Sequence, residues 1–173
     1  MKNIASNTFG YTGIVTLSQY IGQKKVKLAQ IQNTGGQALF NFFSECLTGN
    51  WEVAKATKPT KILLLNYEEV PGANGDIQLS VRDAGVGFIW LTTNPEKVYN
   101  PSACTVRYSF MISGDMLRTT EFNGIGLYTN AATEYDYNNY AAFCKVDKLS
   151  EMVITPSSVL VVDWELNILN KKS

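Results

Sequence analysis

Histidine is absent from this chain of 173 residues. It is the side chain most often used as a general base, as a metal ligand and as the partner of a serine or cysteine nucleophile. Its absence removes the usual hydrolase and metalloenzyme arrangements, although paired carboxylates or lysines can also support catalysis. We therefore predict a structural or binding protein that is not an enzyme and that uses no cofactor.

Charge is also scarce. Charged residues make up 17% of the sequence, against about 25% in typical domains. The 15 basic and 15 acidic residues give no net charge, whereas nucleic-acid binding usually requires a basic excess that displaces counterions from phosphates. We expect no nucleic-acid partner. Two small basic groups are interpreted as solvated surface: Lys24, Lys25 and Lys27, and Lys55, Lys58 and Lys61.

Cysteine is rare and irregularly spaced. Cys46, Cys104 and Cys144 are odd in number, and no C-x-x-C pair occurs. This is neither a disulfide framework nor a zinc pattern. We expect reduced, buried thiols, as in proteins that fold in a reducing cytosol.

Long apolar runs are missing. The longest, such as residues 86–91, are far too short to span a bilayer. Residues 1–7 lack the apolar core of a secretory signal. We expect neither a membrane-embedded protein nor secretion by that route.

Alternation of apolar and polar residues dominates what is present, and this period is typical of strands. Two alternating runs around Gly22 predict a hairpin, with a turn that is not one of the tight two-residue types. A further turn is predicted at residues 71–75, where proline and Asn-Gly favour reversal. Other strands are predicted at residues 61–67, 77–81, 88–93, 105–113, 124–129, 140–146 and 159–169.

One helix is predicted over residues 35–48. Thr34 and Gln37 have the spacing of a capping box, and Gly49 stands where a left-handed C-terminal residue belongs. A further short helical turn is predicted at residues 51–56. The apolar stripe of the helix is interpreted as a core-packing face, formed by Leu39, Phe42, Phe43, Cys46 and Leu47.

Eight or nine short strands and one helix near the start predict a mainly β protein. The expected architecture is an antiparallel β-sandwich with the helix packed at an edge. A jelly roll and a partly open barrel share the same periodicities, so the strand order stays open. No repeat or linker divides the chain, which predicts a single β-rich domain over residues 1–173.

Two pairs of carboxylates were considered as chemical sites, Glu134 with Asp136 and Glu68 with Glu69. Such pairs can serve glycoside hydrolysis or hold calcium. No calcium-loop pattern surrounds them, so we predict no catalytic and no metal residues, and leave open whether Glu134 and Asp136 hold a cation. The glycine fragments at residues 85–87 and 124–126 lack a phosphate-loop pattern, and a bend or bulge explains them.

Residues 128–140 combine tyrosines with asparagines and acidic groups. Tyrosine provides rigid, amphipathic contact area at protein interfaces and sugar platforms. We predict a loop whose tyrosines form an interaction surface, with coverage of the domain's own edge as the alternative. The candidate residues are Tyr128, Tyr135, Tyr137 and Tyr140.

Two stretches carry a family resemblance. One is residues 35–50, GGQALFNFFSECLTGN, followed by residues 54–62, and the other is the ending at residues 153–166, with its Val-x-Trp-x-Leu strand. Their arrangement resembles small virion proteins of tailed bacteriophages, such as auxiliary capsid proteins, head-fibre anchors and tail adaptors. The resemblance transfers no functional residues.

This resemblance implies a role in a particle. The leading expectation is an auxiliary capsid (decoration) or head-fibre-associated component in the virion, made in the host cytoplasm. Its partners would be the major capsid protein or other virion proteins, and also copies of itself as a homo-oligomer. The alternative is a carbohydrate- or receptor-binding module that uses the tyrosine-rich loop. A third hypothesis is a hydrolase based on Glu134 and Asp136.

Overall fold

Long antiparallel strands dominate the computed structural model, which describes residues 8–84, 89–90, 96–99, 103–116, 121–130, 142–146, 149 and 152–171. The helices are α1 (Gln37–Thr48) and α2 (Trp51–Thr57), with a 3-10 turn η1 (Gly114–Met116). The strands are β1 (Thr8–Ile21), β2 (Lys24–Gly35), β3 (Pro59–Pro71), β4 (Ile77–Ala84), β5 (Ile89–Trp90), β6 (Glu96–Tyr99), β7 (Ala103–Ser113), β8 (Glu121–Phe122), β9 (Gly124–Thr129), β10 (Ala142–Val146), β11 (Met152–Val153) and β12 (Val159–Lys171).

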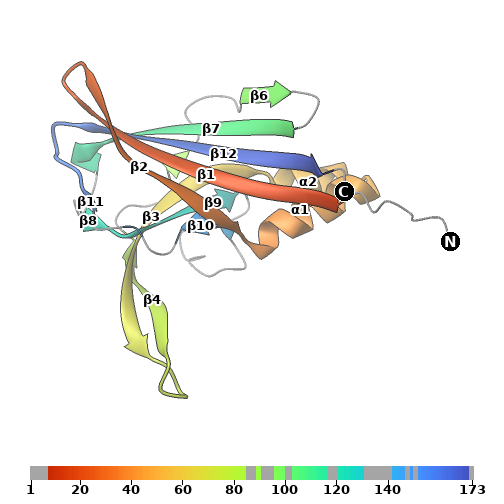
Figure 1. Cartoon of the computed structure of the whole chain (residues 1–173), viewed down its shortest axis with the longest axis horizontal. Coiled ribbons are helices and arrows are strands. Elements are labelled where there is room, and N and C mark those ends of the chain that lie inside the picture. Colours follow the sequence, from red (N-terminus) through yellow and green to blue (C-terminus); the bar gives the residue numbers. More distant parts are fainter. Residues whose placement is uncertain are drawn as a thin grey trace.

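The main sheet has the strand order β4-β3-β9-β10-β2-β1-β12-β7-β6, with β5 paired to β3. Strand β2 connects its two halves, because it pairs with β1 up to Asn33 and then with β10 through Thr34 and Gly35. Strands β8 and β11 pair separately. The pairing is antiparallel throughout, and the sheet ends at β4 and β6 without closing (Figure 1). The prediction of a mainly β, antiparallel protein is confirmed.

Side chains from both halves of the sheet and from α1 meet in one core. In β12, Leu160, Val162 and Trp164 are fully buried, whereas Asp163 and Glu165 on the other face are partly exposed. This is the alternation predicted for the last strand. The other main core residues are Val15, Leu17, Leu39, Ile62, Leu64, Tyr108, Phe110, Ile112, Phe122, Ile125, Leu127, Cys144, Val146 and Ile154.

The first hairpin is confirmed, but its turn is tighter than predicted. Ile21 pairs with Lys24, so only Gly22 and Gln23 connect the strands. Gly22 has φ +60° and no neighbour that an added Cβ would meet. A positive φ at the first of two loop residues is the requirement of a type II′ turn. Glycine is therefore required here because of its positive φ, and not because a side chain would lack room.

The helix prediction is confirmed at its end and wrong at its start. Gly49 has φ +75°, and its N–H donates to the Cys46 carbonyl. The N-terminal cap is Gly36, which has no side chain to donate or accept, and Thr34 belongs to β2. The predicted capping box does not form because the strand continues to Gly35. The second helical turn is confirmed as α2.

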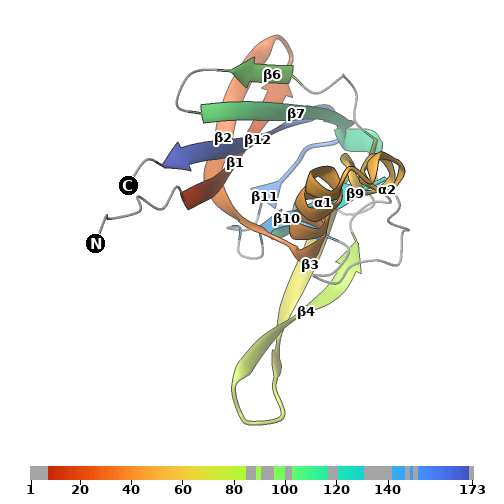
Figure 2. The ribbon, with the colours of Figure 1, turned by 90° about the vertical axis from the view of Figure 1, so that its right-hand side faces the viewer.

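Strand β3 continues well beyond the body of the protein. It pairs with β9 only over Pro59–Leu65, and from there to Pro71 its ladder partner is β4. Residues 66–84 thus form a two-stranded arm that projects from the molecule in both views (Figures 1 and 2). Its turn lies where predicted, with Gly75 at φ +79°. Sequence alternation did not predict the short strands β6, β8 and β11.

Candidate interaction surfaces

Only one of the four candidate tyrosines lies within the described residues. Tyr128 belongs to β9, between Lys61 of β3 and Ala142 of β10, and its side chain is 1% exposed. The placement of Tyr128 in an exposed loop is therefore wrong, because β9 is paired on both sides. Three candidates lie outside the described residues, together with Glu134 and Asp136: Tyr135, Tyr137 and Tyr140.

Gly126 explains how the Tyr128 ring is accommodated. The two residues are two apart on one strand and so share a face. A Cβ on Gly126 would lie 2.4 Å from Cε2 of Tyr128. The glycine thus leaves room for the ring. Register shifts do occur here, in the partner strands β10 and β3 beside Tyr128, whereas Gly126 itself pairs with Lys145 and Leu63.

A polar cluster is built into the core beside Trp164. The Asn33 amide oxygen accepts from the Trp164 indole N–H at 2.7 Å and from a β1 backbone N–H at 3.3 Å, and its nitrogen donates to the Tyr11 hydroxyl at 2.5 Å. The Tyr11 hydroxyl also lies 2.9 Å from Cys144 Sγ. A Cβ on Gly13 would clash with Asn33. The cluster satisfies polar groups that burial would otherwise leave unpaired.

The thiol in this cluster is not a nucleophile at neutral pH. Burial raises the pKa of Cys144 to about 12, although hydrogen bonds with Tyr11 and Gly36 oppose the shift. The thiolate is the reactive and metal-binding form of cysteine. All three cysteines are free, Cys144 is buried as predicted, and Cys46 and Cys104 are half-buried. The cluster is therefore structural.

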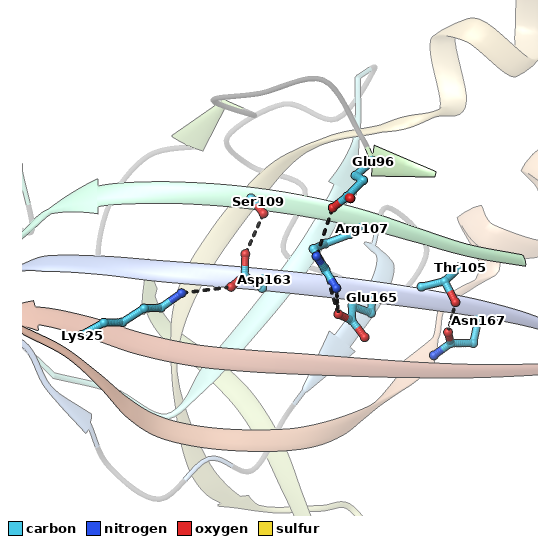
Figure 3. Close-up of polar contacts among 8 residues, drawn as sticks. All are labelled: Lys25, Glu96, Thr105, Arg107, Ser109, Asp163, Glu165 and Asn167. Carbon is cyan, nitrogen blue, oxygen red and sulfur yellow. Dashed lines mark hydrogen bonds and ion pairs between the residues drawn. The ribbon is translucent and has the colours of Figure 1, made fainter. Parts of the chain in front are cut away.

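The outer face of β7 and β12 carries a ladder of polar pairs (Figure 3). Three directly opposed pairs point outward together, namely Ser109 with Asp163, Arg107 with Glu165, and Thr105 with Asn167. Their hydrogen bonds are 2.6, 2.9 and 2.6 Å long. Arg107 extends the ladder to Glu96 of β6 at 3.0 Å, and Lys25 of β2 approaches Asp163 at 3.6 Å. These groups satisfy one another, as cross-strand pairs do.

The two helices present the opposite kind of surface. Leu47 is 89% exposed, Trp51 is 61% exposed and Phe40 is 59% exposed, and Val53 is exposed as well. We call Phe40, Leu47, Trp51 and Val53 the helical patch. Helices α1 and α2 pack on each other, at the end of the sheet opposite the β1–β2 turn (Figure 1). Exposed large apolar side chains on two neighbouring helices are typical of protein interfaces.

The spacing of apolar residues in α1 indicates this patch, although the prediction of a single buried stripe did not include it. Leu47 was assigned to the buried stripe, and this is wrong. Phe40 and Leu47 are seven residues apart, which places them together on one side of α1. The inward face belongs to Leu39, with Phe42 and Phe43 partly buried against the core. An apolar pair beside an already complete stripe indicates a second, outward apolar face.

Within the described residues, no group of three or more cysteine or carboxylate side chains is placed to hold a metal ion. Glu68 and Glu69 are exposed on the arm. No helix among the described residues is long and apolar enough to cross a bilayer.

Comparisons with protein-family models, with curated protein sequences and with solved structures found no match.

Proposed function

We propose that this chain is a structural protein of a bacteriophage virion, an auxiliary capsid (decoration) or head-fibre-associated component that binds the capsid shell. It acts by binding, without catalysis and without a cofactor. The observation that carries this proposal is the helical patch. An exposed tryptophan, phenylalanine and leucine on adjacent helices provide the kind of anchors that dominate binding energy at protein interfaces.

The contact is built on a rigid support. Ala38, Leu39 and Ala54 are buried beneath the helices, so the exposed side chains stand on elements fixed to the core. The partner surface on the shell is apolar where it meets these anchors and polar where it meets the exposed Glu52–Lys55 pair of α2. We expect truncation of a central anchor to weaken binding about 30-fold or more, as for a loss of roughly 2 kcal/mol.

The proposal includes a sandwich-like architecture. The halves β6-β7-β12-β1-β2 and β10-β9-β3 both contribute side chains to one core, and we interpret them as two facing layers joined through β2.

The test is incorporation into particles. Purified particles from the natural source are quantified by mass spectrometry for this chain relative to the major shell protein. The double variant Trp51→Ser/Leu47→Ser is then compared with the wild type, with Met116→Ser as a matched control because Met116 is an exposed apolar residue on η1. A urea melt establishes that each variant folds.

We expect the wild type and Met116→Ser to be incorporated and the patch variant to be lost from particles. Incorporation of the patch variant at wild-type copy number would overturn the role of the patch. Absence of the wild type from all particles would overturn the virion assignment. A glycan-binding module would then be tested with Tyr135→Ala and Tyr137→Ala on a glycan panel.

A further inference from the structure

The arm lacks the support that the rest of the sheet has. Beyond Leu65, β3 has no strand on its β9 side, and β4 forms a ladder only with β3 among the described residues. An isolated two-stranded ribbon is marginally stable in water. Among the described residues, neither the outer edge of β4 nor the edge of β3 beyond Leu65 pairs with another strand, and such open edges favour pairing with another chain.

The arm is acidic. Glu68, Glu69 and Asp76 are exposed along it, and the formal charges of Arg82 and Asp83 near its base cancel. Glu68 and Glu69 are adjacent on β3 and point to opposite faces of the ribbon. Negative charge is therefore available on both faces of the arm.

The β1–β2 hairpin is the basic counterpart. Lys24, Lys25 and Lys27 are exposed, and no acidic residue lies between residues 8 and 44. No strand among the described residues pairs with the outer edge of β2 from Lys24 to Asn33, since β10 begins its ladder at Thr34. This end of the molecule therefore combines an open strand edge with positive charge.

The two charged hairpins cannot satisfy each other within one chain. Figures 1 and 2 show them extending in different directions from the body. Three exposed lysines lie on one projection and three exposed acidic residues on the other, so the two projections carry opposite charge. Each projection fits the other only on a second molecule.

We propose that the acidic arm of one copy binds along the open β2 edge of the next copy, with Glu68 and Glu69 facing Lys24 and Lys27. The contact is head-to-tail, so repetition generates closed rings, including a reciprocal pair, or open chains. Lysines on an open edge also discourage pairing with strands of other proteins. An acidic ribbon can pair there because its carboxylates neutralise the lysine charges. This inference does not depend on the proposed shell binding.

The test exploits charge reversal in both partners. The variant Lys24→Glu/Lys27→Glu makes both projections acidic, and Glu68→Lys/Glu69→Lys makes both basic. Lys25 is left unchanged because it approaches Asp163 of its own chain. The control Lys55→Glu/Lys58→Glu changes net charge as the first variant does, on exposed residues in and just after α2, at the end of the sheet opposite the β1–β2 turn (Figure 1). It breaks the exposed Lys55–Glu52 ion pair within α2, which lies away from both projections.

Association is measured by sedimentation at ionic strengths from about 0.01 M to 0.15 M, over which the screening length falls from about 30 to about 8 Å. We expect wild-type association that weakens with salt. Each projection variant should raise the dissociation constant about tenfold or more, and an equimolar mixture of the two should restore association. The Lys55/Lys58 control should associate like the wild type.

A carbodiimide, which joins lysine amines to carboxylates, gives a second measurement on a mixture of isotope-labelled and unlabelled chains. We expect intermolecular links between peptides that contain Lys24 or Lys27 and peptides that contain Glu68 or Glu69. A wild type that stays monomeric at low salt would overturn the proposal. So would a mixture of the two variants that fails to associate, or links that join other surfaces.

Discussion

Two tryptophans distinguish two regions of this protein. Trp164 in β12 is 0% exposed, and its indole N–H donates to Asn33. Trp51 is mostly exposed at the start of α2, one of the two helices at the end of the sheet opposite the β1–β2 turn (Figure 1). The same residue type therefore stabilises the fold in one region and is available for contact with a partner in the other.

The largest expected effect comes from removing the buried ring. Trp164→Ala should lower the free energy of unfolding by about 3–5 kcal/mol, because it leaves a cavity and an unsatisfied Asn33. Trp51→Ala should change it by about 0.5 kcal/mol or less. Urea unfolding measures both. Equal losses in the two variants would contradict the division between the regions.

Alkaline pH should also destabilise the buried region. The pKa of Cys144 is raised from 9.0 to about 12, and burial raises the pKa of Tyr11 as well. Between pH 9 and about pH 12 the unfolded chain loses the Cys144 proton, whereas the folded chain keeps it. The stability present below about pH 9 is therefore lost as the pH rises. Three pKa units correspond to about 4 kcal/mol by pH 12.

Unfolding measured at pH 8 and pH 11 checks this expectation. Cys144→Ala should lose less stability over that interval than the wild type. An identical loss would show that the buried thiol is not responsible. At neutral pH, a thiol reagent should label half-buried Cys46 on α1 before Cys144, because only the former is accessible without unfolding.

Substitution of two glycines, Gly114 and Gly49, should have smaller effects on stability that also differ between the regions. A Cβ on Gly114 would lie 2.1 Å from the backbone oxygen of Thr155, and backbone gives way less easily than a side chain. Gly114→Ala should cost about 1–3 kcal/mol. Gly49→Ala at the helical end meets nothing within 4 Å and carries only the strain of φ +75°, about 1 kcal/mol. Calorimetric melting of both variants tests the order.

Much of the fold followed from the sequence because the decisive pattern was local. Alternation located β7 and β12 within a few residues, and Gly49 located the end of α1. In these two strands most of the fully buried residues lie on one face, so burial and propensity agree, whereas β9 is buried on both faces. The same agreement placed Trp164 inward.

The remainder depended on contacts between distant segments. No local pattern shows that β3 loses its β9 partner after Leu65, so the arm was not predicted. The room that Gly126 leaves for Tyr128 likewise depends on how β9 is enclosed by β3 and β10. The tyrosine-rich composition favoured a surface role, but both faces of β9 are covered, which places the Tyr128 ring inside.

The smallest expected effect concerns the polar ladder on the outer sheet face. Arg107 joins Glu165 of β12 to Glu96 of β6, and its side chain is 39% exposed. Exposed ion pairs contribute little, so Arg107→Met should cost less than about 1 kcal/mol, and the cost should shrink as salt rises. Unfolding at two salt concentrations measures it, with hydrogen exchange of β6 as a local readout. A loss above about 2 kcal/mol that is independent of salt would mean that this polar face, and not the core alone, determines the stability of the sheet.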